Sequence, residues 1–197
     1  MWHRPRQPDP PAMQTELPAS YQTLTLELHQ QVASVRLNRP DKANAMNLAM
    51  WHDIRQAFDW VDATPEARVA VLQAEGKYFT AGIDLQMMMG LGQEIADDCE
   101  ARMREKLRRL ILDLQDTLTS LERCRKPVLA AIHGGCIGGG IDLITCADMR
   151  YCSSDAFFTI KEIDMATNCL IEHLDLMIRF NGFEVCQRNT FVICLDY

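Results

Sequence analysis

The sequence predicts an α/β fold built around a largely parallel β-sheet. Segments with strand patterns alternate with segments of helical periodicity along most of the chain. The 197 residues, of which 48% are hydrophobic, are enough for one domain with a core of its own. No internal repeat is visible, so a repeat architecture is not expected.

The strands are predicted from short runs in which apolar and polar residues alternate. Residues 21–38 contain two such runs around a polar connection at 29–31, which indicates a pair of strands. The other expected strands are residues 68–76, 127–133, 148–154 and 156–160.

The helices are predicted from apolar residues three and four positions apart. Asn47 is expected to cap a helix over residues 48–63, and a short helix is expected over residues 141–147. A long helix is expected over about residues 93–123, with a solvated, charge-rich face over residues 94–109. Its apolar stripe favours a core face, with a coiled coil as the alternative, and comprises Met103, Leu107, Leu110, Ile111, Leu114, Leu118 and Leu121.

The composition argues against several classes of function. A formal net charge of -7 argues against general nucleic-acid binding, and no apolar run reaches membrane-spanning length. The eight cysteines include no C-x-x-C pair and the five histidines show no ligand spacing. We therefore expect no disulfides, no metal site and a reducing compartment. The expected location is the cytoplasm of a bacterium or a mitochondrion or peroxisome of a eukaryote, and not the outside of the cell.

A glycine-rich run is the first feature that carries chemistry. It contains Gly134, Gly135, Gly138, Gly139 and Gly140, and Asp142 follows two positions later. Its spacing does not fit a G-x-G-x-x-G dinucleotide motif. Gly140 and Ile141 stand where a P-loop needs Lys and Ser or Thr, and the run holds no serine for a nucleophile elbow.

A strand is expected before this run and a helix after it, as in those three motifs. The unpaired N–H groups at a helix start favour an anion or a developing oxyanion. Residues 79–84, FTAGID, form a second glycine-bearing turn between a strand and a helical stretch. Two such turns that converge on one thioester carbonyl would stabilise an enolate.

Four segments together carry a family resemblance. They are NRPDKANAMN at 38–47, GKYFTAGIDL at 76–85, KPVLAAIHGGCIGGGIDLITCADMRY at 126–151 and AFFTIKEIDM at 156–165. In this order and spacing they resemble the enoyl-CoA hydratase/isomerase (crotonase) superfamily over roughly residues 20–165. The residues of these segments are most similar to those of its Δ3,5-Δ2,4-dienoyl-CoA isomerase branch.

The resemblance implies a ββα spiral core, an acyl-CoA thioester substrate and an isomerase of fatty-acid β-oxidation. It implies an oxyanion hole made by the backbone N–H groups of Ile83 and Gly139. Asp142 and Glu162 fall on the carboxylate positions of the family, with Glu162 as proton shuttle and Asp142 in support. No cofactor is implied beyond the coenzyme A of the substrate. The implied substrate-binding residues are Lys42, Ala43, Asn44 and Ala45 along the CoA moiety and Thr80, Ala81, Gly82 and Asp84 in the acyl pocket; Asp84 is also expected to cap a helix.

The chain departs from the family pattern at its carboxyl end. Leu170 stands where the dienoyl isomerases carry a further acid, and residues 167–197 do not resemble the family. We therefore expect three parts: a flexible tail at 1–19, a crotonase-like core at 20–166 and a divergent tail at 167–197. The helical region that builds trimers or hexamers in the family is expected to be largely missing. Two alternatives to the isomerase stay open, namely an enoyl-CoA hydratase and a truncated, non-catalytic domain that binds acyl-CoA or associates with relatives.

Overall fold

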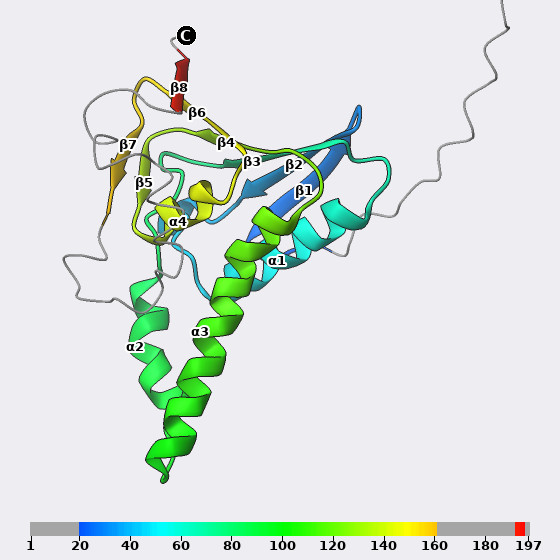
Figure 1. The fold of residues 1–197 in the computed structure, drawn as a ribbon. Helices are drawn as coiled ribbons and strands as arrows, with labels where there is room; N and C mark the ends of the chain where they lie inside the picture. Colours follow the sequence, from blue (N-terminus) through cyan, green and yellow to red (C-terminus); the bar gives the residue numbers. More distant parts are fainter. Residues whose placement is uncertain (1–19, 161–191, 196–197) are drawn as a thin grey trace, which may run out of the picture.

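The computed structural model describes residues 20–160 and 192–195. Six strands form the main sheet in the order β1-β2-β3-β4-β6-β8. β1 (Leu24–His29) and β2 (Val32–Leu37) are antiparallel, and every later neighbour in this sheet is parallel. The α/β class with a largely parallel sheet is thereby confirmed (Figure 1).

The remaining strands of the main sheet are β3 (Val69–Ala74), β4 (Val128–Ile132), β6 (Met149–Ser153) and β8 (Val192–Leu195). The first three lie within the ranges that the alternating pattern predicts. β8 was not predicted, because residues 167–197 were expected to form a divergent tail in which no strand was assigned. It pairs in parallel with β6, with Val192 opposite Arg150, and extends the sheet by one strand.

A second, two-stranded sheet pairs β5 (Gly135–Ile137) with β7 (Phe157–Thr159) in parallel. β7 was predicted and β5 was not, because β5 lies inside the glycine-rich run. A β-carbon on Gly135 would lie 2.7 Å from Cδ1 of Tyr78 and 2.8 Å from Cζ of Phe157. A glycine at this position therefore lets the two aromatic rings pack against the strand.

The helix α1 confirms the sequence prediction, whereas α2 and α3 correct it. α1 (Leu48–Ala63) begins where predicted, and Oδ1 of Asn47 accepts the Met50 N–H at 3.0 Å. The long helix expected over about residues 93–123 begins later than predicted, as α3 (Glu100–Arg123), and residues 93 and 94 end a separate helix, α2 (Leu85–Glu94). Asp97 marks the break, since its carboxylate accepts the Cys99 N–H at 3.0 Å just before α3 begins.

α4 (Gly139–Thr145) starts two residues earlier than predicted, within the glycine run itself. The short 3₁₀ helix η1 (Pro40–Lys42) lies in the loop before α1. No helix in the described part of the chain is long and apolar enough to cross a membrane.

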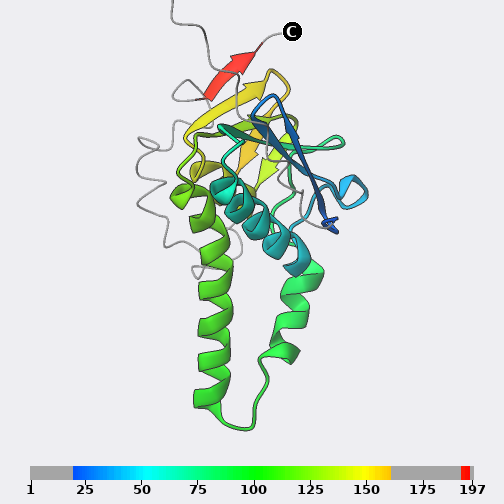
Figure 2. The same cartoon turned by 90° about the vertical axis from the view of Figure 1, so that its right-hand side faces the viewer.

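The apolar stripe of α3 belongs to the core only in its second half. Leu114, Leu118 and Leu121 are buried, whereas Leu107 is exposed. Figure 2 shows why: the first half of α3 and the neighbouring α2 extend together away from the sheet. The prediction of a core face along the whole stripe is therefore wrong for its first half.

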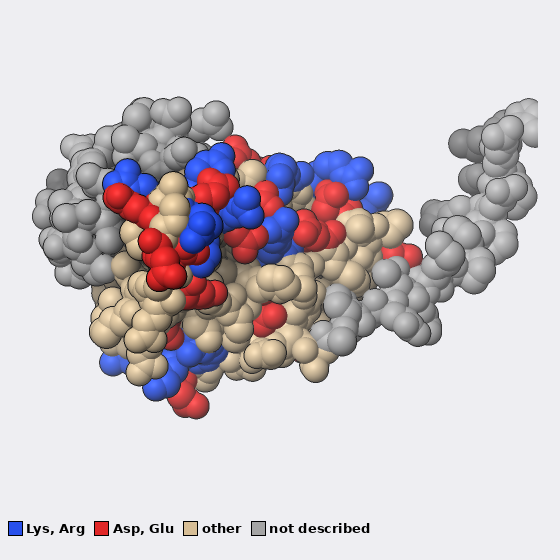
Figure 3. Space-filling view, turned by 90° about the horizontal axis from the view of Figure 1, so that it is seen from below, with Lys and Arg blue, Asp and Glu red and all other residues tan. Residues whose placement is uncertain are grey.

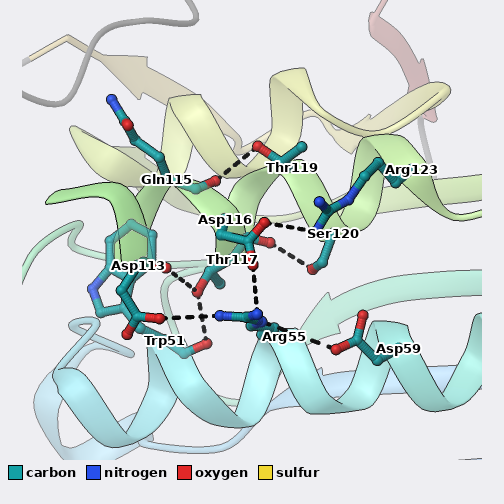
Figure 4. A network of polar contacts seen from close by, with 10 residues as sticks. All are labelled: Trp51, Arg55, Asp59, Asp113, Gln115, Asp116, Thr117, Thr119, Ser120 and Arg123. Atoms are coloured by element: carbon teal, nitrogen blue, oxygen red, sulfur yellow. Dashed lines mark hydrogen bonds and ion pairs between the residues drawn. The ribbon is translucent and has the colours of Figure 1, made fainter. Parts of the chain in front are cut away.

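A polar seam joins α3 to α1 where the two helices pack (Figure 4). The Arg55 guanidinium lies 3.0 Å from Oδ1 of Asp113 and 2.6 Å from Oδ2 of Asp116. The Thr117 hydroxyl adds a bond of 3.3 Å to the carbonyl of Trp51. These contacts hold the second half of α3 against α1.

The projecting part of α3 carries interleaved charges of both signs (Figure 3). Arg102 and Lys106 contact Asp97 at 2.8 and 3.1 Å, and Arg109 contacts Glu105 at 2.9 Å. The arginines and Lys106 are exposed, so the predicted solvated face is confirmed.

Candidate active site

The turn after β3 and the turn after β4 meet at the carboxyl ends of these two strands. The Thr80 N–H donates to the carbonyl of Gly135 at 3.1 Å, and the Ile137 N–H donates to the carbonyl of Thr80 at 3.0 Å. These two bonds form a parallel bridge between Thr80 and Cys136. Backbone hydrogen bonds therefore join the two glycine-bearing turns that the sequence analysis identified.

Gly82 is one of the positions where the two turns approach closely. Its φ is +85°, a left-handed conformation that favours glycine. A β-carbon at this position would lie 2.5 Å from the carbonyl oxygen of Ile137 and 3.3 Å from the amide nitrogen of Gly139. There is no room for a side chain at this position. Because Gly82 has none, its backbone packs directly against Ile137 and Gly139, where α4 begins.

Gly139 and Gly140 open α4 against the same turn. A β-carbon on Gly139 would lie 3.1 Å from Cγ1 of Ile83 and 3.0 Å from Cε of Met46. A β-carbon on Gly140 would overlap with Cγ2 of Thr80. The N-terminal end of α4 thus sits directly on the turn at residues 80–83.

Hydrogen bonds to the backbone of Met46 hold the backbone on either side of Ile83. Met46 donates its N–H to the carbonyl of Gly82 at 2.7 Å and accepts the Asp84 N–H at 3.0 Å, a parallel bridge that flanks Ile83. Because neighbouring groups of an extended chain alternate in direction, the N–H of Ile83 points away from Met46. Within the described residues, neither this N–H nor that of Gly139 donates to a protein acceptor.

The segment expected along the CoA moiety, residues 42–45, lies beside the turn at residues 80–84. Lys42 is exposed at the end of η1, and Ala43 and Ala45 are half-buried. The Ala81 N–H donates to the carbonyl of Ala43 at 2.8 Å. Lys42 is therefore the one member of this segment whose side chain is exposed to solvent.

Asn44 is fully buried and has a structural task. Its amide nitrogen donates to the carbonyls of Glu75 and Tyr78 at 2.7 and 2.9 Å, and its amide oxygen accepts the Arg39 N–H at 2.7 Å. A buried amide with three bonds to backbone groups holds the end of β3 to this loop.

Thr80 and Asp84, both expected near the acyl pocket, also have framework contacts. The buried Thr80 hydroxyl donates to the carbonyl of Asn44 at 2.7 Å and accepts the Gly82 N–H at 3.1 Å. Asp84 caps α2, as expected, by accepting the Gln86 N–H at 2.9 Å. Burial opposes its charge, but the bonds from Gln86 and Arg39 hold the pKa of Asp84 below its usual range.

Asp142 lies in the first turn of α4, three residues after Gly139, and is 4% exposed. Burial, and then the charge of Asp142, raise the pKa of the Cys136 thiol well above its usual range. The structure brings Asp142, Gly139 and Ile83 to one region, since the turn carrying Ile83 packs on the start of α4.

Two positions named by the sequence analysis lie outside the described residues: Glu162 and Leu170. Sequence reasoning also missed Arg39 and Met46. The Arg39 guanidinium donates to the carbonyl of Ala45 and lies 3.2 Å from Oδ2 of Asp84. The available signal was their place in the NRPDKANAMN segment, at either end of the loop that borders the turn.

The described residues contain no group of three or more His, Cys, Asp or Glu side chains that could hold a metal ion. The arrangement brings to one region a buried carboxylate and two backbone N–H groups, those of Ile83 and Gly139, that have no acceptor among the described residues. Such donors stabilise negative charge that develops on a carbonyl oxygen.

Known proteins of one family resemble this chain in sequence and in fold. The family model for enoyl-CoA hydratase/isomerase matches residues 27–188. A mitochondrial Δ3,5-Δ2,4-dienoyl-CoA isomerase of Mus musculus is 47% identical over 146 residues, covering 74% of this chain and 44% of its own length. A peroxisomal Δ3,5-Δ2,4-dienoyl-CoA isomerase of Arabidopsis thaliana is 44% identical, covering 75% of this chain and 54% of its own length. This chain spans about half the length of the curated relatives it matches.

Solved structures share the fold. An enoyl-CoA hydratase/carnithine racemase from Magnetospirillum magneticum is 27% identical, with a TM-score of 0.71, and the match covers 85% of this chain and 60% of the other. An enoyl-CoA hydratase from Shewanella pealeana has a TM-score of 0.74 at 24% identity, with the same coverage of both chains.

Proposed function

The chain belongs to the enoyl-CoA hydratase/isomerase family, and we propose that it isomerises 3,5-dienoyl-CoA to 2,4-dienoyl-CoA. One observation carries this proposal: the turns of residues 80–83 and 138–140 meet so closely that a β-carbon on Gly82 would stand 3.3 Å from the Gly139 nitrogen. Similarity to dienoyl-CoA isomerases from mouse and Arabidopsis supports the choice of reaction within the family.

The proposed reaction moves one proton and shifts two double bonds. A base removes a proton from C2 of the 3,5-diene, and the electron pair spreads over the conjugated system onto the thioester oxygen. Return of a proton to C6 leaves double bonds at C2 and C4. The N–H groups of Ile83 and Gly139 would stabilise the enolate oxygen, a contribution of about 3 kcal/mol per donor in comparable acyl chemistry.

Carboxylates would transfer the protons. Glu162 is proposed as the shuttle on the acyl chain, with Asp142 supporting or sharing that work. Asp142 suits this role because it is buried and lies one helical turn from Gly139, so α4 would supply both a donor and a carboxylate. The reaction changes no oxidation state, so it needs no redox cofactor, and coenzyme A enters as part of the substrate.

The substrate-binding proposal follows the same geometry. Exposed Lys42 would contact the CoA moiety, with the half-buried Ala43 and Ala45 beside it, while the buried Asn44 would hold this segment in place. The backbone of residues 80–84 would border the reacting end of the acyl chain.

The proposed setting is fatty-acid β-oxidation. The relatives from mouse and Arabidopsis are named as mitochondrial and peroxisomal. Either organelle is the proposed location in a eukaryote, and the cytoplasm in a bacterium.

Enoyl-CoA hydration is the second candidate. Leu170 favours it, because this apolar residue stands where the resemblance places the additional acid of the dienoyl isomerases. Asp142 and Glu162 would then hold a water molecule against the 2-enoyl thioester.

A spectrophotometric assay with two substrates tests the proposal. The purified chain is offered 3,5-dienoyl-CoA and 2-enoyl-CoA separately, alongside Glu162→Gln and Asp142→Asn variants. We expect turnover of the dienoyl substrate that Glu162→Gln abolishes while CoA-thioester binding persists. Turnover of the enoyl substrate alone would replace the isomerase by the hydratase. No turnover of either by folded protein would contradict both, leaving a non-catalytic acyl-CoA-binding domain.

A further inference from the structure

Arg39 links two segments that border the proposed oxyanion hole. Its Nη1 donates to the carbonyl of Ala45 and lies 3.2 Å from Oδ2 of Asp84. The Arg39 and Asp84 side chains are only 19% and 14% exposed, so water and salt screen this pair less than an open surface pair. The guanidinium therefore joins the loop before α1 to the residue that directly follows Ile83.

Asp84 is held on both of its carboxylate oxygens. Oδ1 accepts the Gln86 N–H at 2.9 Å and so caps α2, while Oδ2 faces Arg39. The carboxylate is charged at neutral pH, since these bonds hold its pKa below the usual range despite partial burial. Asp84 is thus fixed at the junction between the turn and α2.

The connection from this ion pair to Ile83 runs through Met46. Met46 follows Ala45, the residue whose carbonyl Arg39 holds. Its own backbone bonds Gly82 and Asp84 at 2.7 and 3.0 Å, on either side of Ile83. Any slip of residues 45–46 along residues 82–84 would therefore change the direction of the Ile83 N–H.

We propose that Arg39 and Asp84 are a positioning pair that aims the Ile83 N–H at the thioester carbonyl oxygen. This inference rests on the proposed function, which makes that N–H an oxyanion donor. Arg39 is assigned no contact with substrate, and the Asp84 carboxylate, which the resemblance places at the acyl pocket, is bound on both oxygens by Arg39 and the Gln86 N–H. Their effect is on alignment, and misplacement by about 1 Å costs up to about 100-fold in rate.

The test compares variants that break the ion pair with one that breaks a similar pair elsewhere. Asp84→Asn removes the charge but keeps a good helix cap, and Arg39→Gln removes the charge but keeps an N–H donor. Asp62→Asn is the matched control, because Asp62 pairs with Arg125 at 2.8 Å near the amino ends of β3 and β4, away from the turns.

Three readouts separate positioning from general stability. They are the melting temperature, kcat and KM for 3,5-dienoyl-CoA, and the ultraviolet band of bound 2,4-hexadienoyl-CoA. This band moves to longer wavelength when hydrogen bonds polarise the thioester carbonyl. A residue that served only stability would change the melting temperature and leave the band where it is.

We expect a long-wavelength shift with the wild-type chain and with Asp62→Asn, and a smaller shift with Asp84→Asn and Arg39→Gln. We expect kcat to fall about tenfold in the latter two, with KM within about twofold. If either folded variant kept the wild-type band and kcat, the inference would be overturned and the proposed function would stand. A wild-type chain that binds the thioester without any shift would overturn both. Should Asp84→Asn not fold, Arg39→Gln decides by the same criteria.

Discussion

Gly82 lies so close to Gly139 that a β-carbon on Gly82 would stand 3.3 Å from the Gly139 amide nitrogen. The two residues are 57 positions apart and belong to turns that follow different strands of one parallel sheet. Ligand sites in such sheets form at the carboxyl ends of the strands, which is where these turns lie. The contact determines how far apart the proposed oxyanion donors can be.

Gly82→Ala tests this contact. The methyl group would meet the Ile137 carbonyl at 2.5 Å, and φ of +85° strains any residue with a β-carbon. We expect kcat/KM for dienoyl-CoA to fall by about 100-fold or more, because the two turns must separate. Gly90→Ala is the control: its β-carbon meets nothing within 4 Å, so activity should persist and the helix should gain about 0.5–1 kcal/mol. Wild-type kinetics in Gly82→Ala would show that the close approach is not needed.

Gly140→Ala and Thr80→Ser test the packing of α4 on the turn. The added methyl group would overlap with Cγ2 of Thr80, so we expect a loss of about 1–3 kcal/mol in the free energy of unfolding. Thr80→Ser removes that Cγ2 and retains the hydroxyl that bonds Asn44 and Gly82. The double variant should recover part of the loss, with a coupling of about 1 kcal/mol measured by urea unfolding. Strict additivity of the two changes would contradict direct packing of Gly140 against Thr80.

Asp62 predicts a specific acid dependence of stability. The side-chain bond from Arg125, and then its backbone N–H, lower the pKa of Asp62 from an ordinary 3.8 to about 2. Because the folded-state pKa is the lower one, this stabilisation is present above about pH 4 and is lost as the pH falls through about 2. Solvent screening of this exposed pair keeps the effect below about 1 kcal/mol.

Urea unfolding of the wild-type chain and Asp62→Asn checks this dependence. The difference in their free energies of unfolding should be present at pH 6 and shrink toward zero near pH 2. A difference that stays constant over this range would assign the effect to something other than the Asp62 charge.

Local signals account for the parts of the fold that the sequence predicted. α1 was predicted with its observed bounds, because Asn47 caps it and its periodicity lies within one segment. β5 was missed because its strand conformation depends on β7, whose Phe157 lies opposite Gly135 and 22 positions away. The division between α2 and α3 lies at Asp97, whose carboxylate accepts the Cys99 N–H in the turn before α3 and bonds Arg102, contacts that show only in the folded chain.

The candidate site shows the same limit. The convergence of two glycine turns was predicted, because glycine runs after strands carry a local signal. Residues 42–45 were predicted as a substrate contact, and the part that the loop at residues 39–46 plays in holding the turn in place was missed. Asn44 bonds the carbonyls of Glu75 and Tyr78, more than 30 positions away, and Arg39 pairs with Asp84, 45 positions away. Such partners become visible only when the fold brings them together.

The central claim is that the Ile83 and Gly139 N–H groups bind the thioester oxygen, and amide NMR tests it most directly. The chain, labelled with ¹⁵N, is titrated with 2,4-hexadienoyl-CoA, and the amide protons of both residues are followed, with Gly90 as an internal control. We predict that the Ile83 and Gly139 signals move downfield together at one affinity while Gly90 does not. Saturation of the chain with both signals unmoved would contradict the oxyanion hole and the proposed function built on it.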